Sequence, residues 1–376
     1  MPVTIGALRE RAPGETRVSV VPEVADKLVA LGARVLLERG AGISAQFPDA
    51  LYKNVTWADT AAEVLAQADV LLTVQPPSIA HIGALKAGAV VVGFMQAYAR
   101  PEEVKALRDR RLTSFAMEFV PRISRAQSMD ALSSQAAIAG YKAVLIAANT
   151  LDRFLPMLTT AAGTIRPAQV LIVGVGVAGL QAIATAKRLG AMVEAYDVRS
   201  ATKEQVKSLG AKFIETGVSA DGQGGYAREL TEEEKAKQQA VLEERIAVAD
   251  AVITTASIPG RRAPRIISRA AVERMKAGAV IIDIPAETGG NCELTKAGET
   301  VIHNGVRIVG PVNLPAQLAY HASEMYARNL LNFLKPALDK SGALAIDWQD
   351  EVFVQSCLTH EGAIKHEATA KTLEGT

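Results

Sequence analysis

The sequence is poor in the residues that build disulfide frameworks and metal sites. Only two cysteines, Cys292 and Cys357, occur among 376 residues, and neither belongs to a CxxC pair. This argues against a disulfide framework and against a thiolate zinc site, and it suits a reducing compartment. The five histidines are scattered without the spacing of metal ligands. We therefore expect them to be structural or solvent-facing, and we expect no metal.

An excess of charge of either sign is also absent. Lysine and arginine number 41 against 40 aspartate and glutamate residues, which leaves a formal net charge of +1. Because no basic field is available to neutralise a phosphate backbone, nucleic acid is not expected as a partner.

Long apolar runs are missing as well. The strongest runs, 87–95 and 170–180, are of strand length or interrupted by glycine, whereas a spanning helix needs roughly 20 apolar residues. The first residues lack the basic start and the apolar run of a signal peptide. We therefore expect a soluble, cytoplasmic chain without a membrane span, which can still dock onto a membrane partner.

The composition that remains is globular, with 49% hydrophobic residues and a length that suits two domains. The first third alternates short β-branched runs with amphipathic stretches, which implies a parallel sheet covered on both faces. Strands are expected at 3–8, 34–38, 69–74, 89–95 and 113–120, and helices at 22–31, 61–68 and 101–110.

A second alternation runs from 169 to 312, between helical patterns at 133–150 and 314–338. We expect the first helical pattern to cross between two domains and the second to pack back on the first domain. Residues 359–376 are small and polar, which predicts a loosely held tail.

A glycine-rich turn joins an expected strand to an expected alanine-rich helix within the second alternation. Gly174 permits the tight turn, Gly176 lets the backbone approach a pyrophosphate, and Gly179 allows close packing of helix on strand. The pyrophosphate would lie on the free N–H groups at the start of that helix. The spacing predicts a dinucleotide site, and the alternative is a turn that only serves the fold.

The next expected strand, 192–196, ends in Asp197, about 20 residues after the turn, where an acidic residue holds the adenosine ribose. Its carboxylate would repel a 2′-phosphate, which favours NAD over NADP, although Arg199 weakens that preference. The expected cofactor-binding residues are Gly174, Gly176, Val177, Ala178, Gly179, Asp197, Val198, Arg199, Gly225, Thr255 and Ala256.

Thr255 and Ala256 end a strand in small residues, which suits a surface close to a cofactor. The segment 217–225 is glycine-rich and leads to Tyr226. It is either a mobile lid that carries this tyrosine or a solvent loop, and the sequence leaves both open.

Two segments, 10–18 and 121–135, resemble the soluble NAD(H)-binding component, domain I, of the proton-translocating NAD(P) transhydrogenase family. That family shares its fold with alanine dehydrogenase, and the resemblance covers nearly the whole chain. It implies that the residues that surround the nicotinamide ring and its ribose are Arg122, Gln127, Asp130 and Ser133, and that Tyr226 closes over the nucleotide.

The chemistry favours this interpretation over an amino-acid dehydrogenase, which needs a general acid/base and a cation for the substrate carboxylate. By resemblance, alanine dehydrogenase carries a lysine and a histidine where this chain has Gln75 and Gln96, two amides that cannot titrate. Arg17 stands where the dehydrogenase keeps an arginine, and alone it is expected to serve structure or an interface. Hydride transfer between two nicotinamides needs placement and exclusion of water rather than proton transfer.

The sequence thus predicts two doubly wound, Rossmann-like α/β domains with parallel sheets and a cleft between them. The NAD(H)-binding domain is expected at 136–318, and the flanking domain at 1–135 plus 319–376. By resemblance, NADH bound here would pass hydride to NADP⁺ on a partner domain, while separate membrane-spanning subunits move protons. The resemblance also implies a homodimer on the cytoplasmic face of the inner membrane. The rival functions are an alanine dehydrogenase-like enzyme and a non-catalytic NADH-binding or sensing module.

Overall fold

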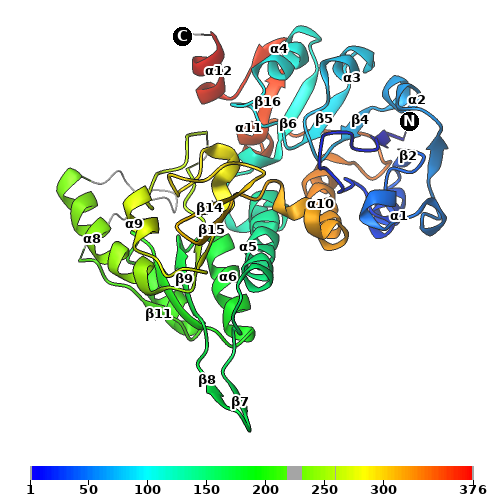
Figure 1. Ribbon diagram of the computed structural model, residues 1–376. Coiled ribbons are helices and arrows are strands. Elements are labelled where there is room, and N and C mark those ends of the chain that lie inside the picture. Colours follow the sequence, from blue (N-terminus) through cyan, green and yellow to red (C-terminus); the bar gives the residue numbers. More distant parts are fainter. Residues whose placement is uncertain (1, 218–230, 259, 375–376) are drawn as a thin grey trace. The chain divides into compact units, whose positions relative to one another are not determined.

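The computed structural model describes residues 2–217, 231–258 and 260–374 (Figure 1). The chain divides into two compact units: unit 1 is Met1–Gln135 with Ala316–Thr376, and unit 2 is Ala136–Pro315. The second boundary thus falls at 315/316, where the sequence placed it at 318/319. Both units are built on mostly parallel sheets, so the predicted α/β fold class is confirmed.

The sheet of unit 1 has eight strands in the order β17-β16-β6-β5-β4-β1-β2-β3. The first six strands along the chain pair in parallel, whereas β16 and β17 pair antiparallel. The strands are β1 (Thr4–Ala7), β2 (Arg34–Glu38), β3 (Thr56–Ala58), β4 (Val70–Leu72), β5 (Val90–Gly93), β6 (Thr113–Ala116), β16 (Cys357–His360) and β17 (Ala363–Ile364).

Helices cover both faces of this sheet, because alternate strand residues belong to two separate apolar clusters. Leu37 and Leu72 pack with side chains of α1 and α10, whereas their neighbours Leu36 and Leu71 pack with those of α2, α3 and α4. The helices of unit 1 are α1 (Pro22–Ala30), α2 (Ala61–Gln67), α3 (Ile79–Ala84), α4 (Pro101–Asp109), α10 (Ala319–Leu334), α11 (Glu351–Ser356) and α12 (Glu367–Glu374).

The sheet of unit 2 has seven strands in the order β11-β10-β9-β12-β13-β15-β14, and only β14 runs antiparallel. Leu171 and Val173 face one apolar cluster, and Val170 and Ile172 face the other, so both faces are again buried. The strands are β9 (Gln169–Val173), β10 (Met192–Tyr196), β11 (Lys212–Phe213), β12 (Ala251–Thr254), β13 (Val280–Asp283), β14 (Thr300–His303) and β15 (Val306–Val309).

The helices of unit 2 include α8, which begins with a capping box in which Thr231 and Glu234 bond each other's main-chain N–H. A separate two-stranded hairpin, β7 (Leu158–Thr160) with β8 (Gly163–Ile165), precedes β9. The helices are α6 (Val177–Arg188), α7 (Thr202–Ser208), α8 (Glu232–Val248) and α9 (Arg269–Glu273).

Helix α5 (Ala131–Thr150) contains the boundary between the units at 135/136. Among the described residues it is the one helix long and apolar enough to cross a membrane, and 44% of its most apolar 18-residue stretch is buried. The core helix of a soluble protein meets the same criteria, so α5 is weak evidence for a span. The sequence-based search for long apolar runs overlooked it because alanine and serine make it only moderately apolar.

Two sequence-based expectations about unit 1 are wrong. The predicted strand 113–120 ends at Ala116, and a 3₁₀ turn, η3 (Met117–Phe119), follows it. In that turn the Glu118 carboxylate accepts the N–H of Met95, two residues past β5, at 3.1 Å, a contact that holds the turn at the end of the neighbouring strand.

The predicted loose tail at 359–376 is also wrong over its described part, because β16, β17 and α12 lie there. Thr359 is fully buried and bonds the Ser114 hydroxyl at 2.7 Å and the Leu112 carbonyl at 2.9 Å. The small polar residues of the C-terminal segment therefore complete the sheet edge, since a hydroxyl group can be buried where a neighbouring strand supplies its hydrogen-bond partner.

Candidate functional site

The glycine turn follows β9 directly and precedes α6. Gly174 has φ +95°, a conformation that side-chain-bearing residues rarely adopt, and a Cβ there would lie 2.6 Å from the Thr255 hydroxyl. A Cβ on Gly179 would lie 2.0 Å from the Gly174 carbonyl oxygen. These two glycines are therefore required by the packing of the turn itself.

Gly176 differs from its two neighbours in the motif. Its φ is −81°, and a Cβ placed on it would meet no atom within 4 Å. The protein's own packing therefore gives no reason for glycine here. Open space at the second glycine is what a pyrophosphate that approaches the backbone requires.

Helix α6 begins at Val177, directly after this open position, with Gly176 as its N-cap. Among the described residues no side chain caps this helix end. The first N–H groups of a helix carry a partial positive charge and seek an acceptor, so this helix start fits an anionic phosphate. Val177 is exposed and Ala178 half-buried, which leaves both accessible to a ligand.

Asp197 follows β10 and is 8% exposed. Its Oδ2 accepts the Val175 N–H at 2.7 Å and the Arg199 Nη2–H at 2.8 Å. Its Oδ1 accepts the Arg199 N–H and Nε–H, both at 2.9 Å. A carboxylate offers about four acceptor positions, so a ribose hydroxyl that binds Asp197 must displace the Arg199 side chain.

A cavity of about 220 Å³ opens beside Asp197. Its walls come from the end of β10 and from residues that the sequence-based prediction missed, because they lie on other elements brought there by folding. Besides Asp197 and Val198, they include Ser200, Lys203, Phe213 and Thr216. An aromatic ring with polar neighbours beside the ribose position suits an adenosine group.

Thr255 and Ala256 follow β12, the strand that pairs with β9 on the side opposite β10. The Thr255 hydroxyl donates to the Gly174 carbonyl at 2.9 Å, and the Thr255 N–H donates to the Val173 carbonyl at 2.8 Å. The residue that follows β12 is therefore hydrogen-bonded directly to the glycine turn.

The four residues expected around the nicotinamide lie in unit 1, on η4 (Ser124–Met129) and its flanks. Arg122 and Gln127 are exposed, and Asp130 is half-buried. Asp130 accepts the Ser133 N–H at 2.8 Å and the Ser133 hydroxyl at 2.6 Å, and so caps α5. The structure thus joins Asp130 and Ser133 in a helix cap.

The C-terminal segment of the chain holds this loop in place. The Ser128 carbonyl accepts the side-chain amides of Asn329 and Asn332 at 2.9 and 3.1 Å. Arg125 forms a two-pronged ion pair with Asp350, at 2.9 and 2.5 Å. The sequence carried no signal for these contacts, because the partners lie about 200 residues further along the chain.

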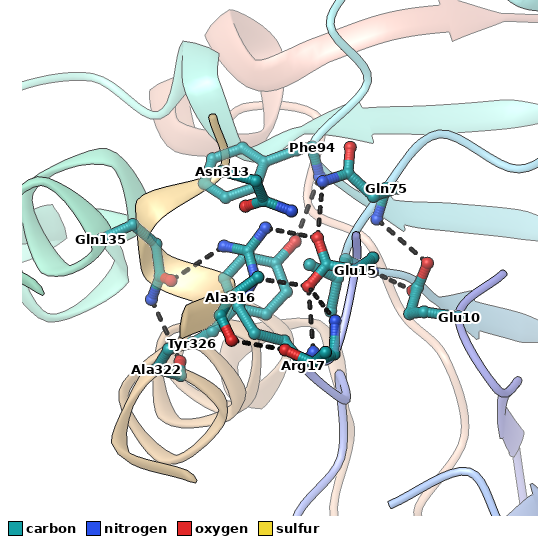
Figure 2. A network of polar contacts seen from close by, with 12 residues as sticks. Glu10, Glu15, Arg17, Gln75, Phe94, Gln135, Asn313, Ala316, Ala322 and Tyr326 are labelled. Atoms are coloured by element: carbon teal, nitrogen blue, oxygen red, sulfur yellow. Dashed lines mark hydrogen bonds and ion pairs between the residues drawn. The ribbon is translucent and has the colours of Figure 1, made fainter. Parts of the chain in front are cut away.

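A buried polar network lies past the carboxyl ends of β1 and β4 in unit 1 (Figure 2). The Arg17 side chain is only 4% exposed, and its Nε and Nη2 bond the Glu15 carboxylate at 2.8 and 2.6 Å. Its Nη1 donates to the side-chain Oε1 of Gln135 at 2.9 Å. Burial by itself would raise the pKa of Glu15, but the Arg17 guanidinium lowers it to about 2. Arg17 is thus a structural ion-pair partner.

Gln75 and Gln96 belong to the edge of the same network. The Gln96 amide donates to Gln75 Oε1 at 2.5 Å, and the Gln75 amide donates to Glu15 Oε2 at 2.7 Å. Neither amide group titrates. A proton donor for amino-acid chemistry is therefore missing at these two positions.

Gly225 and Tyr226 lie outside the described residues. Within the described segments of the chain, no group of three or more histidine, cysteine, aspartate or glutamate side chains could hold a metal ion.

The fold and the glycine turn together define a two-domain α/β protein of the doubly wound, dinucleotide-binding class. Residues 6–139 match the family described as "Alanine dehydrogenase/PNT, N-terminal domain", and residues 143–367 match its C-terminal domain. The chain belongs to the alanine dehydrogenase/PNT family, as the sequence predicted.

Within the family the chain is more similar to transhydrogenases than to dehydrogenases. It is 51% identical to the first component of the NAD(P) transhydrogenase alpha subunit of Rhodospirillum rubrum, over 96% of this chain and 97% of that one. The corresponding component from Rickettsia prowazekii is 45% identical, over 96% and 95%.

One solved structure supports the same placement, and a second shows the shared fold. That of transhydrogenase from Sinorhizobium meliloti is 44% identical, covers 97% of this chain and 99% of that chain, and has a TM-score of 0.85. A solved L-alanine dehydrogenase has a TM-score of 0.83 at 23% identity, over 99% of each chain, which shows the shared fold alone.

Proposed function

We propose that this chain is the NAD(H)-binding component of an NAD(P) transhydrogenase, from which hydride passes to NADP⁺ bound on a separate subunit. The observation that carries the proposal is the open position at Gly176, at the start of the uncapped helix α6. The identity of 51% to the first component of a transhydrogenase alpha subunit supports the choice of reaction.

The residues expected to hold the nucleotide divide by the group they would bind. Gly176, Val177 and Ala178 would hold the pyrophosphate through main-chain N–H groups. Asp197 would accept a hydroxyl of the adenosine ribose once the Arg199 side chain moves aside. Thr255 and Ala256 would border the nucleotide at the neighbouring strand end.

Bound NAD(H) would supply the hydride chemistry. Arg122 and Gln127 would orient the nicotinamide carboxamide and its ribose. Asp130 and Ser133 would keep the loop on the first turn of α5. None of these residues needs to move a proton, because hydride transfer between two nicotinamides involves no proton at the reacting carbons. Their contribution would be placement and the exclusion of water.

The proposed partners are the NADP(H)-binding and membrane-spanning transhydrogenase subunits, with proton movement in those subunits. The chain would act on the cytoplasmic face of the inner membrane through these partners.

A homodimer is also proposed. The hairpin β7–β8 supports it, since a lone two-stranded hairpin is marginally stable. Phe154 and Met157 beside it and Ile165 within it are 54%, 64% and 46% exposed. Sedimentation velocity of wild type and Met157→Glu tests this, and a wild type that sediments as a monomer contradicts it.

The decisive experiment is stopped-flow hydride transfer from NADH to a thio-NADP⁺ analogue, with a separately purified NADP-binding transhydrogenase domain. Rapid transfer is expected only when both proteins are present. Parallel assays with alanine plus NAD⁺, and with pyruvate plus ammonia plus NADH, should stay at background.

An alanine dehydrogenase is the second candidate function, on the strength of the shared fold. The Gln75–Gln96 contact argues against it, because both positions carry amides. Alanine-dependent NADH formation without transhydrogenation would overturn the proposal in favour of the dehydrogenase. NADH binding without either reaction would favour a sensing module.

A further inference from the structure

A second buried polar network lies in unit 2, past the carboxyl ends of β12 and β13. Its centre is Asp283, the last residue of β13, which is fully buried. Asp283 Oδ1 accepts the Thr254 hydroxyl at 2.7 Å and the Asn291 N–H at 3.0 Å. Its Oδ2 accepts the Cys292 N–H at 2.9 Å and the Thr295 hydroxyl at 2.5 Å. With about four acceptor positions filled, the carboxylate is fully satisfied.

The backbone after β13 is shaped to return to this carboxylate. Gly289 and Gly290 have φ values of +103° and +73°, and a Cβ on Gly290 would lie 2.6 Å from Asp283 Oδ2. Only glycine allows the chain to pass this close and in this conformation. The return brings Asn291 back beside the end of β12.

The fully buried Asn291 side chain then clamps the segment after β12. Its Oδ1 accepts the Ala256 N–H at 3.0 Å, and its Nδ2 donates to the Ala256 carbonyl at 2.9 Å. The same Nδ2 donates to the Pro264 carbonyl at 2.7 Å. Both main-chain groups of Ala256 are thus bonded by one side-chain amide.

The clamp is connected to the glycine turn through one residue. Thr255, directly before Ala256, donates its hydroxyl to the Gly174 carbonyl at 2.9 Å. A chain of hydrogen bonds therefore runs from Asp283 through Asn291 to Ala256, and its neighbour Thr255 continues it to the turn where the pyrophosphate is expected. Pairing of β13 with β12 ends at Thr254, so on the β13 side the main chain is held by the bonds of Asn291 to Ala256, while Thr255 is bonded to Val173 on the β9 side.

We propose that Asn291 is a positioning residue for nucleotide binding, which holds Thr255 and Ala256 in the conformation that the dinucleotide turn requires. The inference rests on the proposed nucleotide site and goes beyond it, since the fully buried Asn291 side chain would act through Thr255 and Ala256. The neighbouring Cys292 side chain packs in a buried apolar cluster with Ile281 and Ile267, and burial raises the pKa of its thiol to about 11.

The test compares Asn291→Ala with Thr295→Val in the full chain. Thr295→Val removes a hydroxyl that bonds the same buried carboxylate without contacting 255–256, so it is a matched control for lost stability. NADH affinity is measured by fluorescence titration, thermal unfolding by calorimetry, and hydrogen exchange for peptides that cover 170–180 and 251–258.

Both variants should lower Tm, but only Asn291→Ala should raise the Kd for NADH, by about tenfold or more. Only Asn291→Ala should speed exchange in 170–180. Equal loss of affinity in both variants, or wild-type affinity in a folded Asn291→Ala chain, would overturn the proposal.

Asn291→Asp covers the case in which the alanine variant does not fold. It keeps the acceptor for the Ala256 N–H but loses the Nδ2 donors when ionised. NADH affinity of this variant should recover as pH falls and the carboxyl group regains a proton to donate, whereas Thr295→Val should show no such recovery. A flat pH profile of weakened binding contradicts the role of the clamp. The comparison of NADH affinities between variants does not depend on hydride transfer, so failure of the transhydrogenase assay would leave this test intact.

Discussion

The two sheets of this protein share a strand order but differ in what fills their carboxyl edges. Unit 1 has β3-β2-β1-β4-β5-β6 and unit 2 has β11-β10-β9-β12-β13-β15, both the 3-2-1-4-5-6 arrangement of a doubly wound fold. The likeness extends to single contacts. Glu38 at the end of β2 accepts the N–H of Arg9, two residues past β1, at 2.9 Å. Asp197 after β10 accepts the N–H of Val175, two residues past β9, at 2.7 Å.

The turns that follow the first strands then diverge. In unit 2 the chain enters α6 at Val177 through a turn that leaves open space at Gly176. In unit 1 the chain does not enter α1 until Pro22, and its own carboxylates occupy the edge. There the Val74 N–H, two residues past β4, bonds Glu10 at 2.6 Å. The Ala256 N–H, two residues past β12, instead bonds the Asn291 side chain at 3.0 Å, so no carboxylate of the chain fills this position.

This difference indicates that the proposed nucleotide site depends on the turn after the first strand of a unit, and not on the strand order that the two units share. The crevice at the carboxyl edge of a doubly wound sheet binds a ligand only where the chain leaves it unfilled. In unit 1 the same position is filled by the buried Arg17–Glu15 ion pair and by the Glu10 carboxylate, which we expect to stabilise the fold. The following variants test this division of roles.

The largest expected effect is on stability, from Arg17→Met. The variant leaves the buried Glu15 carboxylate without its partner, which costs about 3–5 kcal/mol of unfolding free energy. Denaturant unfolding measures the loss, and the Kd for NADH should stay unchanged in the folded variant. Lys27→Met removes one of the two exposed partners of Glu23, which keeps Arg328, and should cost at most about 1 kcal/mol. Equal losses would mean that the unit 1 network is not stabilising.

Gly176→Ala should have the largest effect on binding. Its Cβ enters space that the protein leaves open, so Tm should be retained while the Kd for NADH rises about 100-fold, or about 2.7 kcal/mol. Gly83→Ala in α3 is the control, since its Cβ also meets open space but lies in unit 1. Unaltered NADH affinity in Gly176→Ala would show that no ligand approaches this turn.

Glu10→Gln should change the pH dependence of stability. Burial raises the pKa of Glu10 to about 7, from 4.5 for the free side chain, so folding favours its protonated form. Its contribution is present below pH 4.5 and is lost as pH rises to about 7, a loss of at most about 3 kcal/mol. The free energy of unfolding, measured with denaturant between pH 5 and 8, should fall less steeply with rising pH for Glu10→Gln than for wild type. Glu102→Gln, at an exposed position, should follow wild type, and identical slopes in all three chains would contradict the assignment.

The smallest effect is expected from the paired acids. Asp197→Asn should weaken NADH binding about tenfold, or about 1.4 kcal/mol, because a ribose hydroxyl loses a charged acceptor. Glu38→Gln, the corresponding change in unit 1, should leave the Kd for NADH unchanged. Isothermal titration calorimetry measures the Kd for NADH of both variants. A similar loss of NADH affinity in both would contradict the distinction between the two sheet edges.

Local sequence patterns predicted the elements closest to the site. Strand 34–38 and strand 192–196 are confirmed to the residue, because a short, largely apolar segment that follows a glycine turn can be recognised without distant information. The glycine turn could be found for the same reason, since its spacing lies within one strand–turn–helix unit. Whether the named residues bind the nucleotide stays a prediction.

Contacts between distant segments could not be predicted in this way. The polar composition of 359–374 predicted a loose tail, yet Thr359 is buried against strand β6. The sequence of the tail alone does not specify that it pairs with β6. Asn291 stood beside two glycines without any recognisable motif, and its clamp on Ala256 exists only because both strand ends meet at one edge.

The sequence by itself determined the alternation of strands and helices, the family and the position of the dinucleotide turn, because these depend on side-chain periodicity and on residues close in the chain. The tertiary structure alone decided which carboxyl edge stays open and which is filled. That choice depends on where Glu10, Glu15 and Asn291 are brought by folding. Burial then fixes each buried polar group to the partners that satisfy it.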